Sequence, residues 1–169
     1  MQVITERLCI RPLMHDDIDW IHFLCIQTHV KKYLFDNRTV SRSWAEVAIA
    51  NSQLSFTRER FGLWLLCRLT TLRPLGFCGF YYFSAIAEPQ LIYVIHPSEQ
   101  TQGYATEAAQ AVVQYAFSTL RRDRLFANVH GQNLAARRVL EKLGAQIQQH
   151  PAASQPNPHL VQYSISHTD

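Results

Sequence analysis

The chain has 169 residues, of which 47% are hydrophobic and 17% are charged, and its formal net charge is +3. This length suits one domain with a substantial core, and the composition excludes a disordered chain. The 16 Lys and Arg residues are scattered and the net charge is mild, so the sequence does not favour a nucleic acid as partner. We predict a single domain over residues 1–169.

The first 52 residues predict one strand followed by two helices. Polar and apolar residues alternate over residues 7–11, as they do in a half-buried strand. Two aspartates at positions 16–17 then offer N-cap oxygens for a helix through about Cys25. A Ser-x-x-Glu capping box at positions 43–46 begins a second helix that runs toward Ser52.

Three strands are predicted next in the chain. The continuously apolar run at residues 63–67 suits a strand that is covered on both faces. Residues 75–83 read as its partner, and Gly76 and Gly79 within that segment indicate a bulge or a close neighbour. Residues 91–95 form the following strand, which a His-Pro pair ends.

The second half of the chain alternates helices and strands. A helix over about 104–119 carries apolar residues at spacings of three and four, so one of its faces packs on a sheet. A strand at 125–129 precedes a short helix at 133–144, which an asparagine caps and a glycine ends. A loop with three prolines at 151–159 leads to a final strand at 160–165. The order of these elements predicts a mixed sheet flanked by helices.

Cysteine spacing and hydropathy indicate the compartment. None of the four cysteines has CxxC spacing, so we expect buried free thiols in a reducing compartment. These cysteines are Cys9, Cys25, Cys67 and Cys78. His22, Cys25 and His29 have helical spacing but lack a further ligand cluster, and we predict no metal site. Without a signal-peptide pattern or an apolar run of ~18 residues, the sequence predicts a cytoplasmic protein that does not bind membranes.

The segment Gln100-Thr101-Gln102-Gly103-Tyr104-Ala105 joins a predicted strand to a predicted amphipathic helix. A flexible loop at this junction turns several backbone N–H groups toward one anion, and the positive end of the helix dipole lies at the same place. The segment therefore predicts a phosphate or pyrophosphate site. The alternative is an ordinary helix cap beside a turn.

The Gln-x-x-Gly-x-Ala spacing of this loop resembles the acyl-CoA pyrophosphate loop of the GNAT superfamily of N-acetyltransferases. Three longer segments resemble the branch that includes the ribosomal-protein N-terminal (alanine/serine) acetyltransferases: residues 5–13, 103–108 and 133–144. The resemblance spans most of the chain in the correct order. It implies an α+β fold in which a central mixed, mostly antiparallel sheet is flanked by about four helices.

In this family acetyl-CoA lies in an opening between two splayed strands, and it is the cosubstrate expected here. The strand that ends at Ile95 would pair with the pantetheine through its backbone, and the loop would hold the pyrophosphate through N–H groups. Gly103 would avoid a Cβ where the chain passes closest to phosphate oxygens. The residues expected to contact the cofactor are Ile95, His96, Gln100, Gln102, Gly103, Ala105, Thr106, Asn133 and Arg137.

Two positions in the second cofactor segment keep alternatives open. Asn133 contacts the cofactor arm, caps its helix, or does both. At ~100° per residue, Arg137 shares a helix face with Asn133, whereas Arg138 and Lys142 fall on the opposite side. Arg137 is therefore the better candidate for a CoA phosphate, and a solvated arginine is the alternative.

The family's acid and base groups are absent at the matching positions. Gln90 stands where many members carry a glutamate base, and an amide cannot accept a proton at neutral pH. Ala136 and Leu140 stand where members carry a serine or tyrosine acid. The remaining candidates for the catalytic base are Glu88 and His96.

The sequence predicts an acetyl-CoA-dependent N-acetyltransferase that acts by direct attack of a primary amine in a ternary complex. Proximity and alignment alone supply ~7–11 kcal/mol of a barrier, so the missing groups slow the transfer without forbidding it. Loss of the base favours an acceptor of low pKa such as a peptide α-amine. The alternative function is an acyl-CoA-binding protein of this fold with little activity, acting as a sensor or partner.

The predicted partner is an amine-bearing small molecule or a protein N-terminus, with no nucleic acid or membrane involved, and the chain is expected to be a monomer or homodimer. Five aromatic residues in the early helical region form either an acceptor pocket or ordinary core. They are Trp20, Phe23, Tyr33, Phe35 and Trp44.

Overall fold

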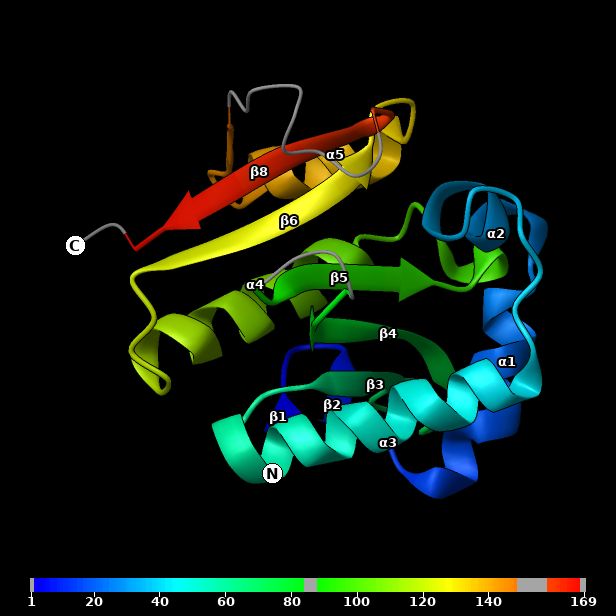
Figure 1. Cartoon of the computed structure of the whole chain (residues 1–169). Helices are drawn as coiled ribbons and strands as arrows, with labels where there is room; N and C mark the ends of the chain where they lie inside the picture. The colour runs from blue at the N-terminus through cyan, green and yellow to red at the C-terminus, as the bar shows by residue number, and fades with distance from the viewer. Residues whose placement is uncertain (1, 84–87, 149–157, 168–169) are drawn as a thin grey trace.

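An eight-stranded sheet in the order β1-β2-β3-β4-β5-β6-β8-β7 forms the centre of the protein (Figure 1). The computed structural model describes residues 2–83, 88–148 and 158–167. The strands are β1 (Val3–Ile4), β2 (Leu8–Pro12), β3 (Leu63–Arg68), β4 (Pro74–Tyr81), β5 (Gln90–Ile95), β6 (Arg124–His130), β7 (Gln146–Ile147) and β8 (Leu160–Ser166). The helices are α1 (Ile18–Cys25), α2 (Thr28–Leu34), α3 (Arg42–Glu59), α4 (Tyr104–Ser118) and α5 (Leu134–Lys142), with 3₁₀ turns η1 (His15–Asp17) and η2 (Pro97–Glu99).

The sheet is antiparallel except where β5 meets β6. Strands β1 to β5 pair antiparallel with their neighbours, as do β6, β8 and β7. Within the described residues, β5 and β6 are parallel and share one register pair, Gln90 with Phe126. The two strands separate toward the C-terminal end of β5 (Figure 1). The sheet is therefore split at its centre.

Helices cover both faces of the sheet. α1 and α3 lie on one face, and α4 lies on the other with α5 on its side of the sheet (Figure 1). Ala108 and Ala109 of α4 are fully buried, and such small side chains let the helix approach the strands closely. The apolar residues thus form two clusters, one under α4 and one under α1 and α3.

Most predicted strands and helices are confirmed, and two caps differ from the prediction. The second helix begins two residues earlier than predicted: Ser41, not Ser43, is the N-cap of α3, and its side chain accepts from the N–H of Trp44. The helix also continues beyond Ser52 to Glu59. The Asp17 carboxylate does not cap α1, because it accepts from Arg11 and from the N–H of Met14 instead.

The predicted close neighbours of two β4 glycines are confirmed. A Cβ at Gly76 would lie 2.0 Å from the carbonyl oxygen of Val94, and one at Gly79 would lie 2.1 Å from that of Gly62. The register also shifts opposite this strand, between Leu66 and Cys67 of β3. Close strand packing therefore requires glycine at both positions.

Three strands and helices have no predicted segment, namely β1, α2 and β7. α2 has only seven residues, too few for a clear helical period. Asn133 caps α5, as predicted, and Gly144 adopts a left-handed φ of 73° after it. Most of the predicted proline-rich loop, residues 151–157, lies outside the described residues.

All four cysteines are buried free thiols, as predicted. Burial raises the pKa of Cys25 to about 12, and the His22 ring bonds the carbonyl of Val40. Among the described residues, no group of three His, Cys, Asp or Glu side chains is placed to hold a metal ion. None of the helices in the described ranges is long and apolar enough to cross a membrane.

Candidate active site between β5 and β6

A cavity of about 440 Å³ lies where β5 and β6 separate. It is bordered by α2, β5, the loop that leads into α4, β6 and α5. Its lining includes the whole run from Leu91 to Ile95, and Asn128, Val129 and His130 on the facing strand. Because β6 leaves β5 after one shared pair, the β5 edge toward this cavity is open to an extended ligand. Two amides of a pantetheine arm fit such an edge as an added strand would.

The loop before α4 has an unusual backbone. Gln100 is extended, with φ −71° and ψ 169°, whereas Thr101 and Gly103 have positive φ values of 64° and 86°. Thr101 is β-branched, and this conformation is strained for such a residue. Alternating backbone conformations of this kind make concavities lined by N–H groups, and the first N–H groups of α4 lack intrahelical partners. The backbone geometry of this loop therefore suits an anion, and residues 100–105 are named the anion loop.

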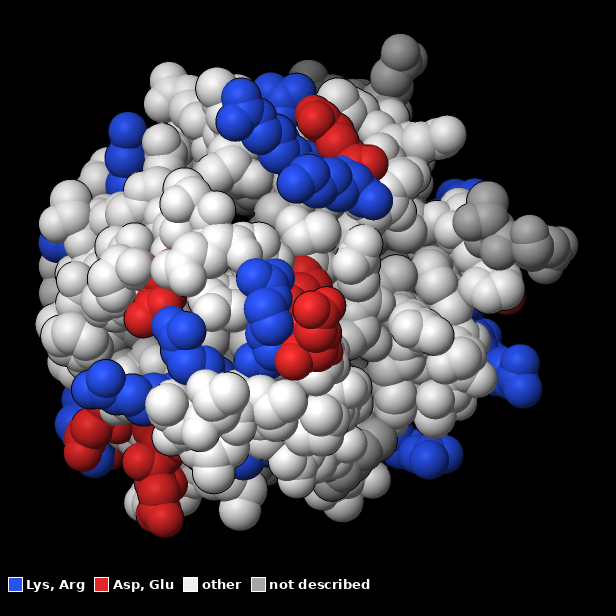
Figure 2. Space-filling view, turned by 180° about the vertical axis from the view of Figure 1, so that it is seen from behind, with Lys and Arg blue, Asp and Glu red and all other residues white. Residues whose placement is uncertain are grey.

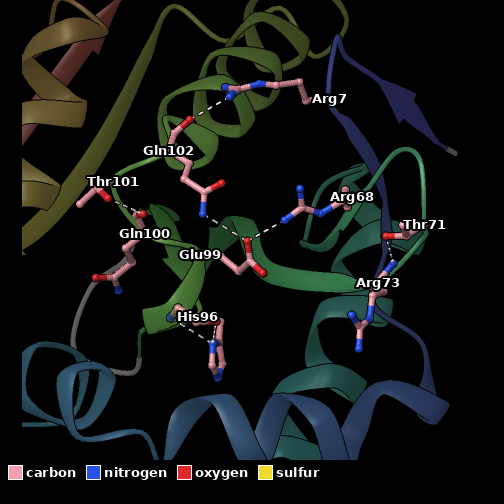
Figure 3. A network of polar contacts seen from close by, with 10 residues as sticks. Arg7, Arg68, Thr71, Arg73, His96, Glu99, Gln100, Thr101 and Gln102 are labelled. Carbon is pink, nitrogen blue, oxygen red and sulfur yellow. Dashed lines mark hydrogen bonds and ion pairs between the residues drawn. The ribbon is translucent and has the colours of Figure 1, made fainter.

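The predicted loop residues divide between the cavity and the outside. Gln100, Gly103, Ala105 and Thr106 line the cavity. Gln102 is absent from the described lining: its carbonyl accepts from Arg7, and its side-chain amide lies 3.4 Å from a carboxylate oxygen of Glu99 (Figure 3). The structure thus brings most of the predicted loop together around one space.

The structure shows a requirement for glycine at position 103 that the sequence does not reveal. A Cβ there would lie 3.2 Å from Nη2 of Arg7, its nearest described heavy atom. The missing side chain therefore leaves room for Arg7 behind the loop, and the positive φ adds a second requirement for glycine.

The arginine expected to face the cofactor turns elsewhere. The Arg137 guanidinium donates to the Tyr163 hydroxyl at 2.9 Å and to the Gly131 carbonyl at 3.3 Å. The hydrogen bond with Tyr163 raises the pKa of Arg137. The described cavity lining holds Arg138 and Lys142 instead. The helical wheel gave the wrong face because Asn133 precedes α5 with φ −80° and ψ 74°, outside helical geometry.

Asn133 lines the cavity and also caps α5 through its side-chain oxygen, at 3.2 Å from the N–H of Ala136. The two alternatives for this residue are therefore compatible in the structure.

The two candidate bases lie apart from the cavity. The His96 ring bonds Ser98, stacks on Phe23 with centroids 5.7 Å apart, and points away from the loop (Figure 3). Glu88 is exposed and borders a hollow of about 20 Å³ beside the far end of α4, with Arg122. That hollow lies about one strand length, ~20 Å, from the anion loop.

Gln90, at the family's base position, is 1% exposed. Its amide nitrogen donates to the Glu88 carbonyl at 2.9 Å, and its Oε1 has no partner among the described residues. It therefore shapes the start of β5 and offers no acid or base.

Tyr93 is a site residue that the sequence prediction missed. It lines the cavity from β5, and its hydroxyl donates to the Ala136 carbonyl of α5 at 2.6 Å. Burial raises the pKa of Tyr93, so the phenol stays neutral. The bond ties the two sides of the split sheet together. No local pattern marks such a contact across 43 residues.

The wall of the cavity formed by α2 and the end of β6 is aromatic. Tyr33 of α2 lies 5.0 Å from the His29 ring and 5.5 Å from the His130 ring, and all three residues line the cavity. Of the five aromatics noted in the sequence, Tyr33 borders this space, whereas Phe35 and Trp44 stack edge to face on each other and pack against the core under α1 and α3. The early helical region therefore contributes rings both to the wall of the cavity and to the core.

The charged side chains seen from behind form small groups in which Lys and Arg lie beside Asp and Glu (Figure 2). Two such pairs flank the loop, Arg7 with Glu107 at 2.7 Å and Arg68 with Glu99 at 2.8 Å.

Comparison with known proteins identifies the class. A family model described as an acetyltransferase (GNAT) domain matches residues 7–146, so the chain belongs to the GNAT acetyltransferase family. An uncharacterized N-acetyltransferase of Bacillus subtilis (strain 168), YnaD, is 27% identical over 144 residues, which cover 85% of this chain and 82% of YnaD. The family and such relatives identify the chain as an acetyltransferase and imply acetyl-CoA as its cosubstrate.

Solved structures share the fold. An acetyltransferase from Agrobacterium tumefaciens strain C58 superposes with a TM-score of 0.87 at 22% identity, covering 99% of this chain and 95% of that one. RimL, a ribosomal L7/L12 alpha-N-protein acetyltransferase in complex with coenzyme A, superposes with a TM-score of 0.78 at 15% identity, covering 97% and 96%. The predicted mixed, mostly antiparallel α+β fold is confirmed, and the described part of the chain holds five α-helices where about four were expected.

Proposed function

We propose that the chain transfers the acetyl group of acetyl-CoA to a primary amine by direct attack in a ternary complex. The observation that carries the proposal is one cavity that joins the loop before α4 to the open edge of β5. The first feature suits a diphosphate and the second suits the amides of pantetheine. A thioester at the junction of the two features would lie beside the aromatic rings that line the cavity from α2, which we propose as the acceptor side.

Backbone groups hold most of the cosubstrate. The N–H groups of Gly103 and Ala105 donate hydrogen bonds to the diphosphate, and the Thr106 hydroxyl donates another. Arg138 and Lys142, which line the cavity from α5, attract the remaining phosphate charge. The Asn133 side chain is committed to its cap, so its contribution is to fix the start of α5 beside the cofactor.

Transfer then depends on position rather than on an acid–base pair. The amine nitrogen bonds to the acetyl carbon, the carbon–sulfur bond breaks, and the sulfur leaves as a thiolate of pKa about 8.5 that needs no obligatory proton. The amine's proton passes to solvent. Holding the reactants aligned supplies ~7–11 kcal/mol of the barrier, enough to replace the missing groups in part. Tyr93, neutral and fixed, keeps the two walls at a constant separation.

The acceptor we propose is a peptide N-terminal α-amine or another amine of low pKa. Such an amine is partly neutral near pH 8 without a base. Within the described cavity lining, Glu99 is the one acidic residue, and Arg68 pairs with it. The site thus offers little attraction to polyamines. RimL, which shares the fold, is an alpha-N-protein acetyltransferase, and this likeness supports the same choice.

Two measurements test the proposal. Isothermal titration calorimetry of the purified chain with acetyl-CoA tests binding, and release of free CoA thiol with a panel of peptides, lysine derivatives and polyamines tests transfer. We expect saturable binding and the fastest release with peptides that have a free N-terminus. Absence of binding at millimolar acetyl-CoA would exclude the function. A preference for lysine or polyamines would exclude the proposed acceptor alone.

A further inference from the structure

We infer that Arg7, which lies outside the cavity, is a positioning residue that sets the anion loop for the cosubstrate. This inference rests on the proposed function. Arg7 precedes β2, about a hundred residues before the loop in the sequence, yet its side chain reaches the loop from behind (Figure 3). Four observations support the role. Arg7 donates a hydrogen bond to the loop backbone, it is anchored by Glu107 of α4, and it contacts the Tyr104 ring. Its guanidinium also lies where a side chain at position 103 would begin.

The bond to the loop orients one peptide. Nη1 of Arg7 donates to the carbonyl oxygen of Gln102 at 2.8 Å. In a trans peptide the C=O and the following N–H point in opposite directions. Holding the Gln102 carbonyl toward Arg7 therefore turns the N–H of Gly103 away from Arg7. Gly103 lines the cavity, so this N–H is turned toward the anion site.

Arg7 is itself anchored by the first turn of α4. Its Nε donates to Oε2 of Glu107 at 2.7 Å, and its backbone N–H donates to Oε1 at 2.8 Å. Thr5 also donates to Oε1, at 2.6 Å. Burial acts to raise the pKa of Glu107, but the bonds from Thr5 and Arg7 outweigh it and the pKa is lowered. The carboxylate stays ionised and compensated, so it does not oppose an anion at the start of the helix.

An aromatic ring fixes the angle of approach. The Arg7 guanidinium lies 4.8 Å from the centroid of the Tyr104 ring, whose residue is 5% exposed. Arg68 lies 5.6 Å from the same ring centroid, but it bonds the Glu99 carboxylate and not the loop backbone (Figure 3). Both arginines thus contact the same ring, but of the two only Arg7 also holds a loop peptide.

Arg68 neutralises Glu99, which lines the cavity, so the matched control is a different arginine. Arg122 lies 5.5 Å from the centroid of the Phe61 ring and pairs with Glu59 at 3.5 Å. It is outside the described lining of the cavity.

The loop needs an external tie because its own conformation is strained. Thr101 has a φ of 64°, which is unfavourable for a β-branched residue, and it persists only where surrounding contacts hold it. Gly103, with a φ of 86°, has its missing Cβ 3.2 Å from Arg7 Nη2. Glycine at position 103 therefore leaves the space that the Arg7 guanidinium occupies, whereas a side chain there would displace the guanidinium.

A direct contact between Arg7 and the cosubstrate does not account for these observations. Arg7 is absent from the described lining of the cavity, and its guanidinium is committed to Glu107 and Gln102. A purely structural role is the remaining alternative. Because the Arg7 side chain is 43% exposed, an ion pair there contributes little stability. The experiment therefore separates loop geometry from stability.

The test compares Arg7→Gln with Arg122→Gln, since each removes one positive charge, one ion pair and one contact with an aromatic ring. We expect Arg7→Gln to weaken CoA binding by about 10- to 100-fold in calorimetry, the range for loss of a charge-assisted hydrogen bond. Arg122→Gln should change it less than about threefold. In amide NMR spectra of the unliganded protein, the Gly103 resonance should shift in Arg7→Gln and stay in place in Arg122→Gln.

A truncated substrate distinguishes positioning from folding. S-acetylpantetheine lacks the diphosphate, so its kcat/KM with the preferred amine should be the same in Arg7→Gln and in the natural chain. Equal loss with acetyl-CoA and S-acetylpantetheine would overturn the inference, as would equal effects of the two glutamine variants. If Arg7→Gln does not fold, Arg7→Lys replaces it and should show a smaller loss confined to CoA. If the natural chain binds CoA and Arg7→Gln binds it equally well, this inference alone is rejected. If the natural chain does not bind CoA, the proposed function is rejected.

Discussion

The two sides of the split sheet present different groups to the cavity: the proposed cofactor side presents backbone amides, and the proposed acceptor side presents side-chain rings. On the cofactor side, backbone groups of the loop and of β5 face the cavity, and helix starts hold them in place. On the acceptor side, aromatic and imidazole rings from α2 and β6 meet across a long stretch of sequence. The position of backbone amides is determined locally, by glycines and by the spacing of turns in the sequence. The position of a cluster of side chains is determined by which distant elements pack together.

This difference explains which changes are expected to matter. The cofactor side should respond sharply to backbone substitutions and weakly to the loss of single side chains inside the cavity. Substitutions in and around the cavity test this difference, beginning with the one that should weaken CoA binding most.

Gly103→Asp should abolish CoA binding, with a loss of at least about 100-fold. A side chain at a φ of 86° costs ~1–2 kcal/mol, and its carboxylate would draw Arg7 away from the loop and repel the diphosphate. Gly144→Asp is the matched control, since Gly144 has a φ of 73° and no described heavy atom within 4 Å of its Cβ position. Calorimetry with CoA should show normal binding in the control. Similar losses in both variants would refute the special role of Gly103.

Replacing Arg138 and Lys142 together by Gln should weaken CoA binding by about 3- to 30-fold, as expected for two partly exposed charges. The dependence of the dissociation constant on salt should also become shallower. Arg137→Gln is the control, because Arg137 bonds Tyr163 and Gly131. An opposite ranking, with Arg137 the stronger effect, would restore the orientation predicted from the helical wheel.

Glu107→Gln should lower the melting temperature at pH 7, and the difference from the natural chain should disappear in acid. The folded-state pKa of Glu107 lies below its ordinary value of 4.5. Its ionised form therefore stabilises the fold above that value, and the contribution is lost as the pH falls through the folded-state pKa. Thermal unfolding between pH 3 and pH 8 measures this. A difference that persists unchanged at the acidic end would contradict the assignment.

Glu88→Gln should change kcat/KM less than about twofold, because a carboxylate about one strand length from the loop cannot reach the amine. His96→Gln should behave similarly, since its ring packs on Phe23. A hundredfold fall in kcat for either variant, with normal CoA binding, would identify a base that the geometry does not bring to the cavity.

The cofactor side could be predicted from the sequence because its signals are local. The loop at 100–105 and the cap at Asn133 each lie within a few residues of the helix that they start. In the structure α4 begins at Tyr104, directly after Gly103, and Asn133 caps α5. The choice of Arg137 was wrong because it assumed helical geometry at Asn133, where the chain is not helical. Even on this side, Arg7 was missed, since only folding brings it to Gln102.

The acceptor side could not be predicted in the same way. α2 is short and shows no clear period, so Tyr33 had no predicted position. His29 lies one helical turn before Tyr33 in α2, but His130 comes from β6, and no sequence spacing relates β6 to α2. Likewise, Glu88 was chosen for its distance from Gln90 along a strand, but β5 begins only at Gln90. Side-chain surfaces of this kind are set by tertiary packing.

The most direct measurement is a crystal structure of the chain with coenzyme A bound. We expect the diphosphate to accept hydrogen bonds from the N–H groups of Gly103 and Ala105, and the pantetheine to run along β5 toward Tyr33. Coenzyme density outside the space between β5 and β6, or a diphosphate that touches neither N–H group, would contradict the proposed site.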